Sequence, residues 1–144
     1  MSEKKPIYLV SACLCGEPCR YDGGCTPDKR VLELMEAGLV LPFCPEAEIG
    51  TPREPCERTS DGRIVSRSGK DFTQAFQKGA EKALELCRMY EIKKAVLKER
   101  SPSCGVHKVY DGSFSGKQIP GMGLTARLLS QNGIDVKSEE DDSL

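Results

Sequence analysis

The stretch IYLVSAC, residues 7–13, contains the first predicted β-strand, at 7–12, and Cys13 follows that strand directly. Its first six residues are apolar or small and include β-branched side chains, which is typical of a strand buried on both faces. The same pattern returns twice. The apolar run 39–43 is followed at once by Cys44, and a strand expected at 94–98 precedes Cys104, which lies on a Pro/Gly-rich turn. Three predicted strands are therefore each followed by a thiol.

Helical signals separate these strands. Thr26 is expected to cap a first helix, which Gly38 ends. Asp71 is expected to cap the longest helix, in which apolar residues recur at three- and four-residue spacing. A third helix precedes Gly133, and a short strand at 134–136 follows it. This alternation predicts an α/β, Rossmann-like three-layer domain with a short, mainly parallel sheet.

The chain length of 144 residues predicts a single domain, 1–144, with a polar leader at 1–6 and an acidic tail at 138–144 that we expect to fray. Two segments, 44–69 and 99–118, lack a helical period and are expected to be long irregular loops at the carboxyl edge of the sheet. The first of them is interpreted as a flap that covers a site.

Composition narrows the function classes. The eight cysteines are not needed to stabilise a domain of this size, and no apolar segment at the N-terminus is long enough for export. We therefore expect a soluble, cytoplasmic protein, in which surplus thiols indicate metal binding or redox chemistry. The net charge of −1 and the absence of a basic patch argue against nucleic acid and favour a small, nearly neutral ligand.

Three of the cysteines are predicted to meet. The carboxyl ends of parallel strands lie at one edge of a sheet, so Cys13, Cys44 and Cys104 should converge there. Three thiolates around one point suit a [4Fe–4S] cluster whose fourth iron has no protein ligand, and such an iron is a Lewis acid. The first loop lacks the C-x2-C pair of zinc ribbons, so zinc stays open but is not indicated.

The other cysteines give weaker signals. Cys87 falls in the apolar stripe of the longest helix, where a free thiol behaves as a small hydrophobe. Cys15 and Cys25 are interpreted as spectators in the first loop, and Cys19 has no assigned role. Cys56, on the predicted flap, is interpreted as a spectator or a backup thiol.

Several short motifs follow one another along the chain, namely SACLCG at 11–16, CRYDG at 19–23, CPE at 44–46, TPR at 51–53, LK at 97–98 followed by SPSCG at 101–105, and YDGSF at 110–114. Taken in order, these motifs resemble those of the bacterial thiouracil desulfidase family in its short, single-domain form. The resemblance extends from about residue 7 to residue 136. It implies a Rossmann-like domain in which three cysteines hold an oxygen-sensitive [4Fe–4S] cluster that removes sulfur from a thiolated uracil and releases sulfide.

Carried over by motif, the family's cluster ligands fall on Cys13, Cys44 and Cys104, the cysteines that strand-end geometry also selects. The implied acid/base residues are Glu46 and Ser101. In the implied mechanism, the thiocarbonyl sulfur binds the open iron, Glu46 activates a water, and Ser101 moves a proton or holds the pyrimidine. The net hydrolysis consumes no electron.

Further residues are weaker candidates. Asp22 and Glu48 are additional carboxylates near the motifs, and Cys15 stands where the family commonly has leucine, so that it could replace Cys13 as a ligand. Four ring side chains could stack on the base, namely Tyr21, Tyr110, Phe114 and His107.

Two rival readings remain open. His107 follows Cys104 closely, which leaves a cysteine-dependent hydrolase as an alternative. A non-catalytic metal- or sulfur-binding module is the other, although the carboxylate beside Cys44 and the long flap favour an enzyme, because a closed structural site needs neither. For the enzyme, the expected partners are a small thiolated pyrimidine, as base or nucleoside, and the iron–sulfur assembly machinery.

Overall fold

The computed structural model describes residues 6–17, 24–46 and 54–144. In chain order its elements are β1 (Tyr8–Ser11), the 3₁₀ helix η1 (Ala12–Cys15), α1 (Lys29–Glu36), β2 (Val40–Phe43), β3 (Cys56–Arg58), β4 (Ile64–Ser66), α2 (Thr73–Met89), β5 (Lys94–Leu97), β6 (Lys108–Tyr110), β7 (Gln118–Pro120), α3 (Leu124–Gln131) and β8 (Asp135–Ser138). Strands β2, β1, β5 and β8 form one sheet in that order, and every pair in it is parallel.

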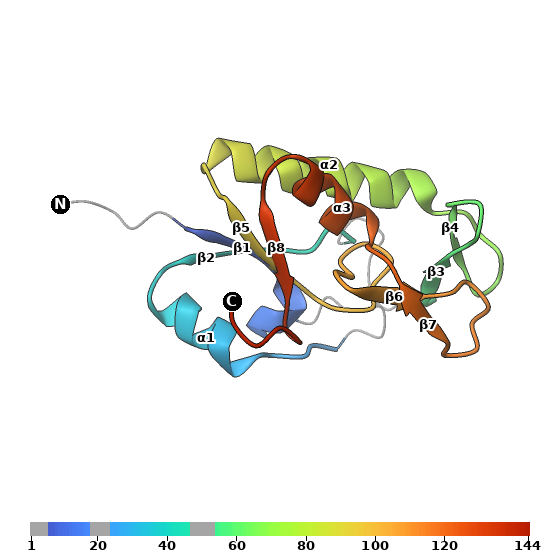
Figure 1. The fold of residues 1–144 in the computed structure, drawn as a ribbon, viewed down its shortest axis with the longest axis horizontal. Coiled ribbons are helices and arrows are strands. Elements are labelled where there is room, and N and C mark those ends of the chain that lie inside the picture. Colours follow the sequence, from blue (N-terminus) through green and yellow to red (C-terminus); the bar gives the residue numbers. More distant parts are fainter. Residues whose placement is uncertain (1–5, 18–23, 47–53) are drawn as a thin grey trace.

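Helices cover both faces of this sheet (Figure 1). On one face, Leu9 and Leu97 pack in a core with residues of α2 and α3. On the other face, Val10 and Val96 pack against Val31 of α1 and against η1. Successive strand residues point to opposite faces, so each inner strand must be apolar throughout. The predicted three-layer α/β fold is confirmed. None of the described helices is both long enough and apolar enough to span a bilayer.

The four sheet strands lie within two residues of their predicted bounds, but the first helix begins later than predicted. Its cap is Asp28, whose Oδ1 accepts the backbone N–H groups of Arg30 at 2.9 Å and Val31 at 3.3 Å. The hydroxyl of Thr26 has no hydrogen-bond partner among the described residues. A carboxylate beside the first free N–H groups satisfies two donors of the helix terminus, which explains why Asp28 replaces Thr26.

The prediction of two irregular loops is wrong in part, because one short antiparallel hairpin lies within the first segment and another begins in the second and ends just beyond it. Strands β3 and β4 pair between residues 56 and 66, and strands β6 and β7 pair between residues 108 and 120. Each of these strands has three residues, too few to establish a two-residue hydrophobic period. The hairpins lie side by side beyond the end of the sheet (Figure 1).

The acidic tail is not frayed as predicted, because the chain around it supplies donors. Glu139 accepts a hydrogen bond from the backbone N–H of Glu99 at 2.7 Å and pairs with the ammonium of Lys98 at 2.8 Å. The guanidinium of Arg30 donates to the backbone carbonyls of Glu139 at 2.6 Å and Asp141 at 2.7 Å. These contacts fasten the tail to β5 and to α1.

The pair of His107 and Asp141 gives this attachment a pH dependence. Nε2 of His107 lies 2.9 Å from Oδ1 of Asp141, and this hydrogen bond raises the pKa of the imidazole above its usual value. Burial opposes ionisation of Asp141, but hydrogen bonds from the backbone N–H of Ser138 and from His107 outweigh it and lower the pKa of the carboxyl.

We predict that the Asp141→Asn variant lowers the pKa of His107, measured by NMR titration of this single histidine. The histidine's contribution to stability is present below its unfolded pKa, about 6.5, and is lost as the pH rises through the folded pKa. The aspartate's contribution is present above about pH 4 and is lost on acidification. The pair should therefore stabilise the fold between these limits, by only about 0.5 kcal/mol because His107 is more than half exposed. An unchanged His107 titration in the variant would contradict the pairing.

Candidate functional site

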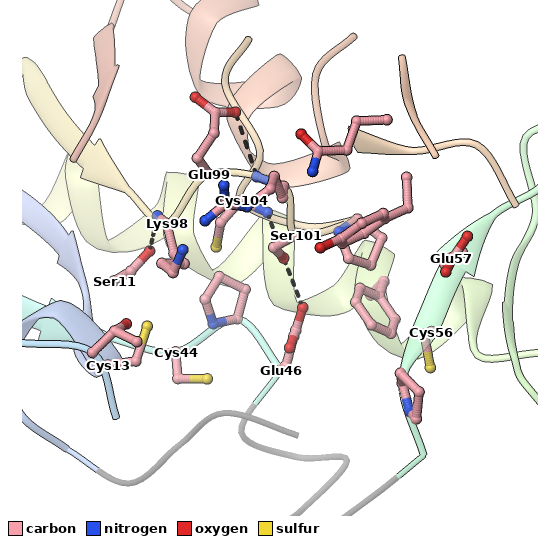
Figure 2. Close-up of a pocket in the computed structure, with 18 of the residues that line it drawn as sticks. Ser11, Cys13, Cys44, Glu46, Cys56, Glu57, Lys98, Glu99, Ser101 and Cys104 are labelled. Carbon is pink, nitrogen blue, oxygen red and sulfur yellow. Dashed lines mark hydrogen bonds between the residues drawn. The ribbon is translucent and has the colours of Figure 1, made fainter. Parts of the chain in front are cut away.

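The predicted cysteines meet at the carboxyl edge of the sheet. The strand order is β2, β1, β5, β8, so the chain runs from β1 to β2 on one side and from β5 to β8 on the other. The connections therefore leave the ends of β1 and β5 in opposite directions, and a crevice opens between them. Cys13 follows β1, Cys44 follows β2, and Cys104 follows β5. All three line one cavity of about 500 Å³ (Figure 2). Cys13 and Cys104 are buried, whereas Cys44 is half-buried.

The Cys-Pro-Glu turn that carries Cys44 and Glu46 rests on helix α2. A Cβ atom placed on Gly79 of α2 would lie 1.9 Å from the carbonyl oxygen of Pro45, so only glycine lets the helix approach this closely. Pro45 is buried by this contact, and Glu46 is half-buried and lines the cavity. The glycine thus fixes how far the turn projects toward the other cysteines.

Ser101 connects the Cys104 turn to Glu46. Its hydroxyl donates to Oε1 of Glu46 at 3.0 Å, and the same oxygen accepts the backbone N–H groups of Ser103 and Cys104, each at 3.0 Å. A hydroxyl has one proton and two lone pairs, and all three are used here. The two predicted acid/base residues are therefore in direct contact, and both line the cavity (Figure 2).

Ser11 ties the end of β1 to Cys104. Its Oγ accepts the backbone N–H of Lys98 at 2.9 Å, and its hydroxyl donates to the thiol of Cys104. Burial raises the pKa of Cys104, the charge of Glu46 raises it further, and the hydrogen bond from Ser11 acts in the opposite direction. Without a metal the Cys104 thiol is therefore neutral, which does not suit a nucleophile.

The carboxylate of Glu99, which the sequence analysis did not select, is buried and shapes the turn that follows Cys104. Glu99 is only 2% exposed, and its Oε1 accepts the backbone N–H groups of Val106 at 2.7 Å, His107 at 2.8 Å and Lys108 at 3.1 Å. Burial acts to raise the pKa of Glu99, but these hydrogen bonds outweigh it, so that the pKa lies below its usual value. The sequence signal that could have identified Glu99 was its position as an acidic residue directly after a buried strand.

His107 does not complete a Cys–His pair. Its imidazole bonds to Asp141 of the tail, and the side chain is not among those that line the cavity. This placement removes the geometric basis of the cysteine-dependent hydrolase, which needs a base within hydrogen-bonding reach of the thiol.

The remaining predicted residues separate into four groups. Cys56, Tyr110 and Phe114 line the cavity. Cys87 is buried in the core as predicted, and burial raises its pKa to about 11. Cys15 is also buried in a core, where burial raises its pKa to about 11, and Cys25 is exposed. Four further candidates lie outside the described residues, namely Cys19, Tyr21, Asp22 and Glu48.

The spacing of the thiols bears on the kind of metal group. In the part of the chain that the structure describes, no three His, Cys, Asp or Glu side chains are arranged to hold one metal ion. Ligands of a single zinc ion must lie about 4 Å from one another, because each is about 2.3 Å from the metal. In a cluster each thiolate binds a different iron, so the sulfur atoms lie further apart. Cys13, Cys44 and Cys104 all line the cavity, and soft thiolates are the donors that iron–sulfur clusters use, so the residue types present fit a cluster.

The comparisons with known proteins agree with this geometry. A family model described as 2-thiouracil desulfurase matches residues 8–141. The chain belongs to this family. The uncharacterized protein YbbK of Bacillus subtilis (strain 168) is 40% identical over 146 residues, covering 94% of this chain and 97% of its own length.

A solved structure of the family is also similar. It is described as a [4Fe–4S]-dependent thiouracil desulfidase, TudS, and it matches with a TM-score of 0.87 and 45% identity over 95% of this chain and 92% of that chain. The resemblance deduced from the motifs is thereby confirmed.

Gly79 offers a direct test of how the Cys-Pro-Glu turn is positioned. Replacement of a helix-interior glycine by alanine ordinarily stabilises by up to about 1 kcal/mol. At Gly79 we predict the opposite sign, a destabilisation of about 2 kcal/mol with loss of iron binding, because the new methyl group overlaps the backbone of Pro45. Urea unfolding and iron analysis measure the two effects.

The matched control is Gln77→Ala, an exposed position on the same helix, which should leave both quantities unchanged. A stabilised Gly79→Ala variant with normal iron content would show that α2 does not fix the turn.

Proposed function

We propose that this protein is a [4Fe–4S]-dependent desulfidase that hydrolyses the carbon–sulfur bond of a thiolated uracil, as the free base or nucleoside, and releases sulfide. The observation that supports it most is the cavity in which Cys13, Cys44 and Cys104 lie beside Glu46 and Ser101. Membership of the family and the likeness to TudS point to the same reaction.

The donor set fits a cluster held by three cysteines. Soft thiolates are the ligands that iron–sulfur clusters use, and three of them, Cys13, Cys44 and Cys104, line the same cavity. When bound, the cluster supplies an iron without a protein ligand that acts as a Lewis acid toward sulfur. Cys13, Cys44 and Cys104 would hold it.

Glu46 would serve as the general base. Its carboxylate accepts the proton of a water whose oxygen adds to the ring carbon, and the carbon–sulfur bond then breaks. Water and thiouracil give uracil and hydrogen sulfide, so no electron is gained or lost. Ser101 would orient this carboxylate, since its hydroxyl donates to Oε1. The same hydroxyl fixes the backbone of Cys104, so one side chain positions both the base and a cluster ligand.

The charges around the cavity favour a small substrate over a nucleic acid. Three cations among the described residues line the cavity: Lys98 pairs with Glu139 at 2.8 Å, Arg100 pairs with Glu140 at 3.1 Å, and Arg67 lies over the ring of Phe114. Neutralised cations provide little attraction for a phosphate backbone. We further propose that the protein acts in the cytoplasm, where thiols stay reduced, and that the iron–sulfur assembly machinery supplies its cluster.

The ligand assignment predicts the effect of single cysteine substitutions. After anaerobic reconstitution, the wild-type protein should hold about four irons with matching acid-labile sulfide. Cys13→Ser, Cys44→Ser and Cys104→Ser should each lose most of the iron and the visible absorption, because a hydroxyl is a poor ligand for iron in a cluster.

The control is Cys25→Ser, at an exposed position outside the cavity, which should keep the full iron content. Full iron in any of the three ligand variants would remove that cysteine from the assignment, and absence of iron from the wild type would exclude the desulfidase mechanism.

A separate prediction concerns Glu46. The Glu46→Gln variant keeps an oxygen that accepts the hydrogen bond of Ser101 but cannot take a proton, so kcat should fall about a hundredfold or more at normal iron content. Sulfide release from 2-thiouracil measures this, with Glu81→Gln on the exposed side of α2 as the matched control. Normal turnover in Glu46→Gln would assign the base to another residue.

A further inference from the structure

The two hairpins form one wall of the cavity. Cys56, Glu57 and Arg67 reach it from the hairpin of β3 and β4 or its flanks, and Tyr110, Phe114 and Gln118 reach it from the hairpin of β6 and β7. Figure 2 shows Cys56 and Glu57 on β3, on the opposite side of Glu46 from Cys13 and Cys44. This wall therefore faces the region where the non-sulfur part of a bound substrate would lie.

The second hairpin is fastened to the first by a buried carboxylate. Glu57 is 8% exposed, and its Oε1 accepts the backbone N–H groups of Gly112 at 3.0 Å and Phe114 at 3.2 Å. Gly112 has a φ of +95°, and a Cβ atom there would lie 2.7 Å from the carbonyl oxygen of Arg58. The loop between β6 and β7 is thus seated directly on the backbone of β3.

Phe114 has a strained backbone at this seat. Its φ is +57°, in the left-handed region that bulky side chains rarely adopt. Strain of this kind persists where the surroundings impose it, and it gathers at functional sites. Here the imposed conformation presents a half-buried aromatic side chain to the cavity, with the guanidinium of Arg67 over its ring at 5.8 Å from the centroid.

We propose that Phe114 is the aromatic surface on which the pyrimidine ring of the substrate packs, and that Glu57 is the positioning residue that holds Phe114 there. This inference rests on the proposed function, since it assigns the ring-binding element of the same cavity. A planar pyrimidine has an apolar face that stacks on an aromatic ring. Phe76 also lines the cavity, but it is only 1% exposed, so the protein covers the faces of its ring.

Stacking on Phe114 predicts that the enzyme prefers planar rings over puckered ones. A variant that only loses structure in general would not change this preference between substrates. The wild-type enzyme should discriminate 2-thiouracil from its 5,6-dihydro analogue, which carries the same thiocarbonyl on a puckered ring. In Phe114→Leu, the KM for 2-thiouracil should rise about tenfold with little change in kcat, and the discrimination between the two substrates should shrink by a similar factor. Phe114→Tyr should restore both values.

The matched control is Phe72→Leu, the same exchange at the start of α2, outside the residues that line the cavity. Iron content is measured in every variant, and the dissociation constant of the product uracil, determined by equilibrium dialysis, gives a readout that needs no turnover. Weaker uracil binding in Phe114→Leu alone supports the proposal.

Glu57 is tested through its hydrogen bonds. Glu57→Gln keeps a side-chain oxygen that can accept the N–H groups of Gly112 and Phe114, whereas Glu57→Ala removes it. Glu57→Ala should therefore reproduce the raised KM and the lost ring discrimination of Phe114→Leu at unchanged iron content, and Glu57→Gln should largely restore them.

The outcomes separate this inference from the proposed function. If the wild-type protein with full iron releases no sulfide from 2-thiouracil, the proposed function fails. If it does release sulfide, but Phe114→Leu keeps the wild-type KM, uracil affinity and ring discrimination, the assignment of Phe114 is overturned while the desulfidase stands.

Discussion

The site depends on one constraint, the parallel pairing of β1 with β2 on one side and with β5 on the other. The register places Ser11 beside Phe43 and Val10 beside Val96, so that the three strands end nearly level. Each strand is then followed by a segment that carries a cysteine. A slip of one residue would turn every side chain of the strand to the opposite face, and both faces are buried here. The apolar packing of the sheet therefore also fixes where the thiols meet.

Beyond the strand ends, short polar contacts set the positions of individual groups. A serine hydroxyl joins Glu46 to the Cys104 turn, and a second serine joins Cys104 to the end of β1. The absence of a side chain at Gly79 also sets these positions, because it lets helix α2 contact the backbone of Pro45. These contacts couple the proposed cluster ligands to the proposed acid/base pair, so that displacement of one element would displace the other.

Three carboxylates hold the surrounding loops through backbone N–H groups. Glu99 closes the turn after Cys104, Glu57 seats the loop between β6 and β7, and Glu139 attaches the tail to β5. Hydrogen bonds to ionised groups are about twice as strong as those between neutral groups, and a buried carboxylate without donors would be costly. A few strong hydrogen bonds to carboxylates thus fix loops that have no long ladder of strand hydrogen bonds. The walls of the cavity that these loops form are therefore held in place.

The sequence by itself determined the α/β fold, the four sheet strands and the convergence of Cys13, Cys44 and Cys104. These follow from apolar periodicity and from the rule that parallel strands end at one edge, which are properties of local sequence and sheet geometry. Only the tertiary structure decided the two hairpins, the ordered tail and the loop carboxylates Glu57 and Glu99. The carboxylates Glu57, Glu99 and Glu139 bond to backbone N–H groups, which for Glu57 and Glu139 are distant along the chain, and such donors leave no mark in the identity of the residues that supply them.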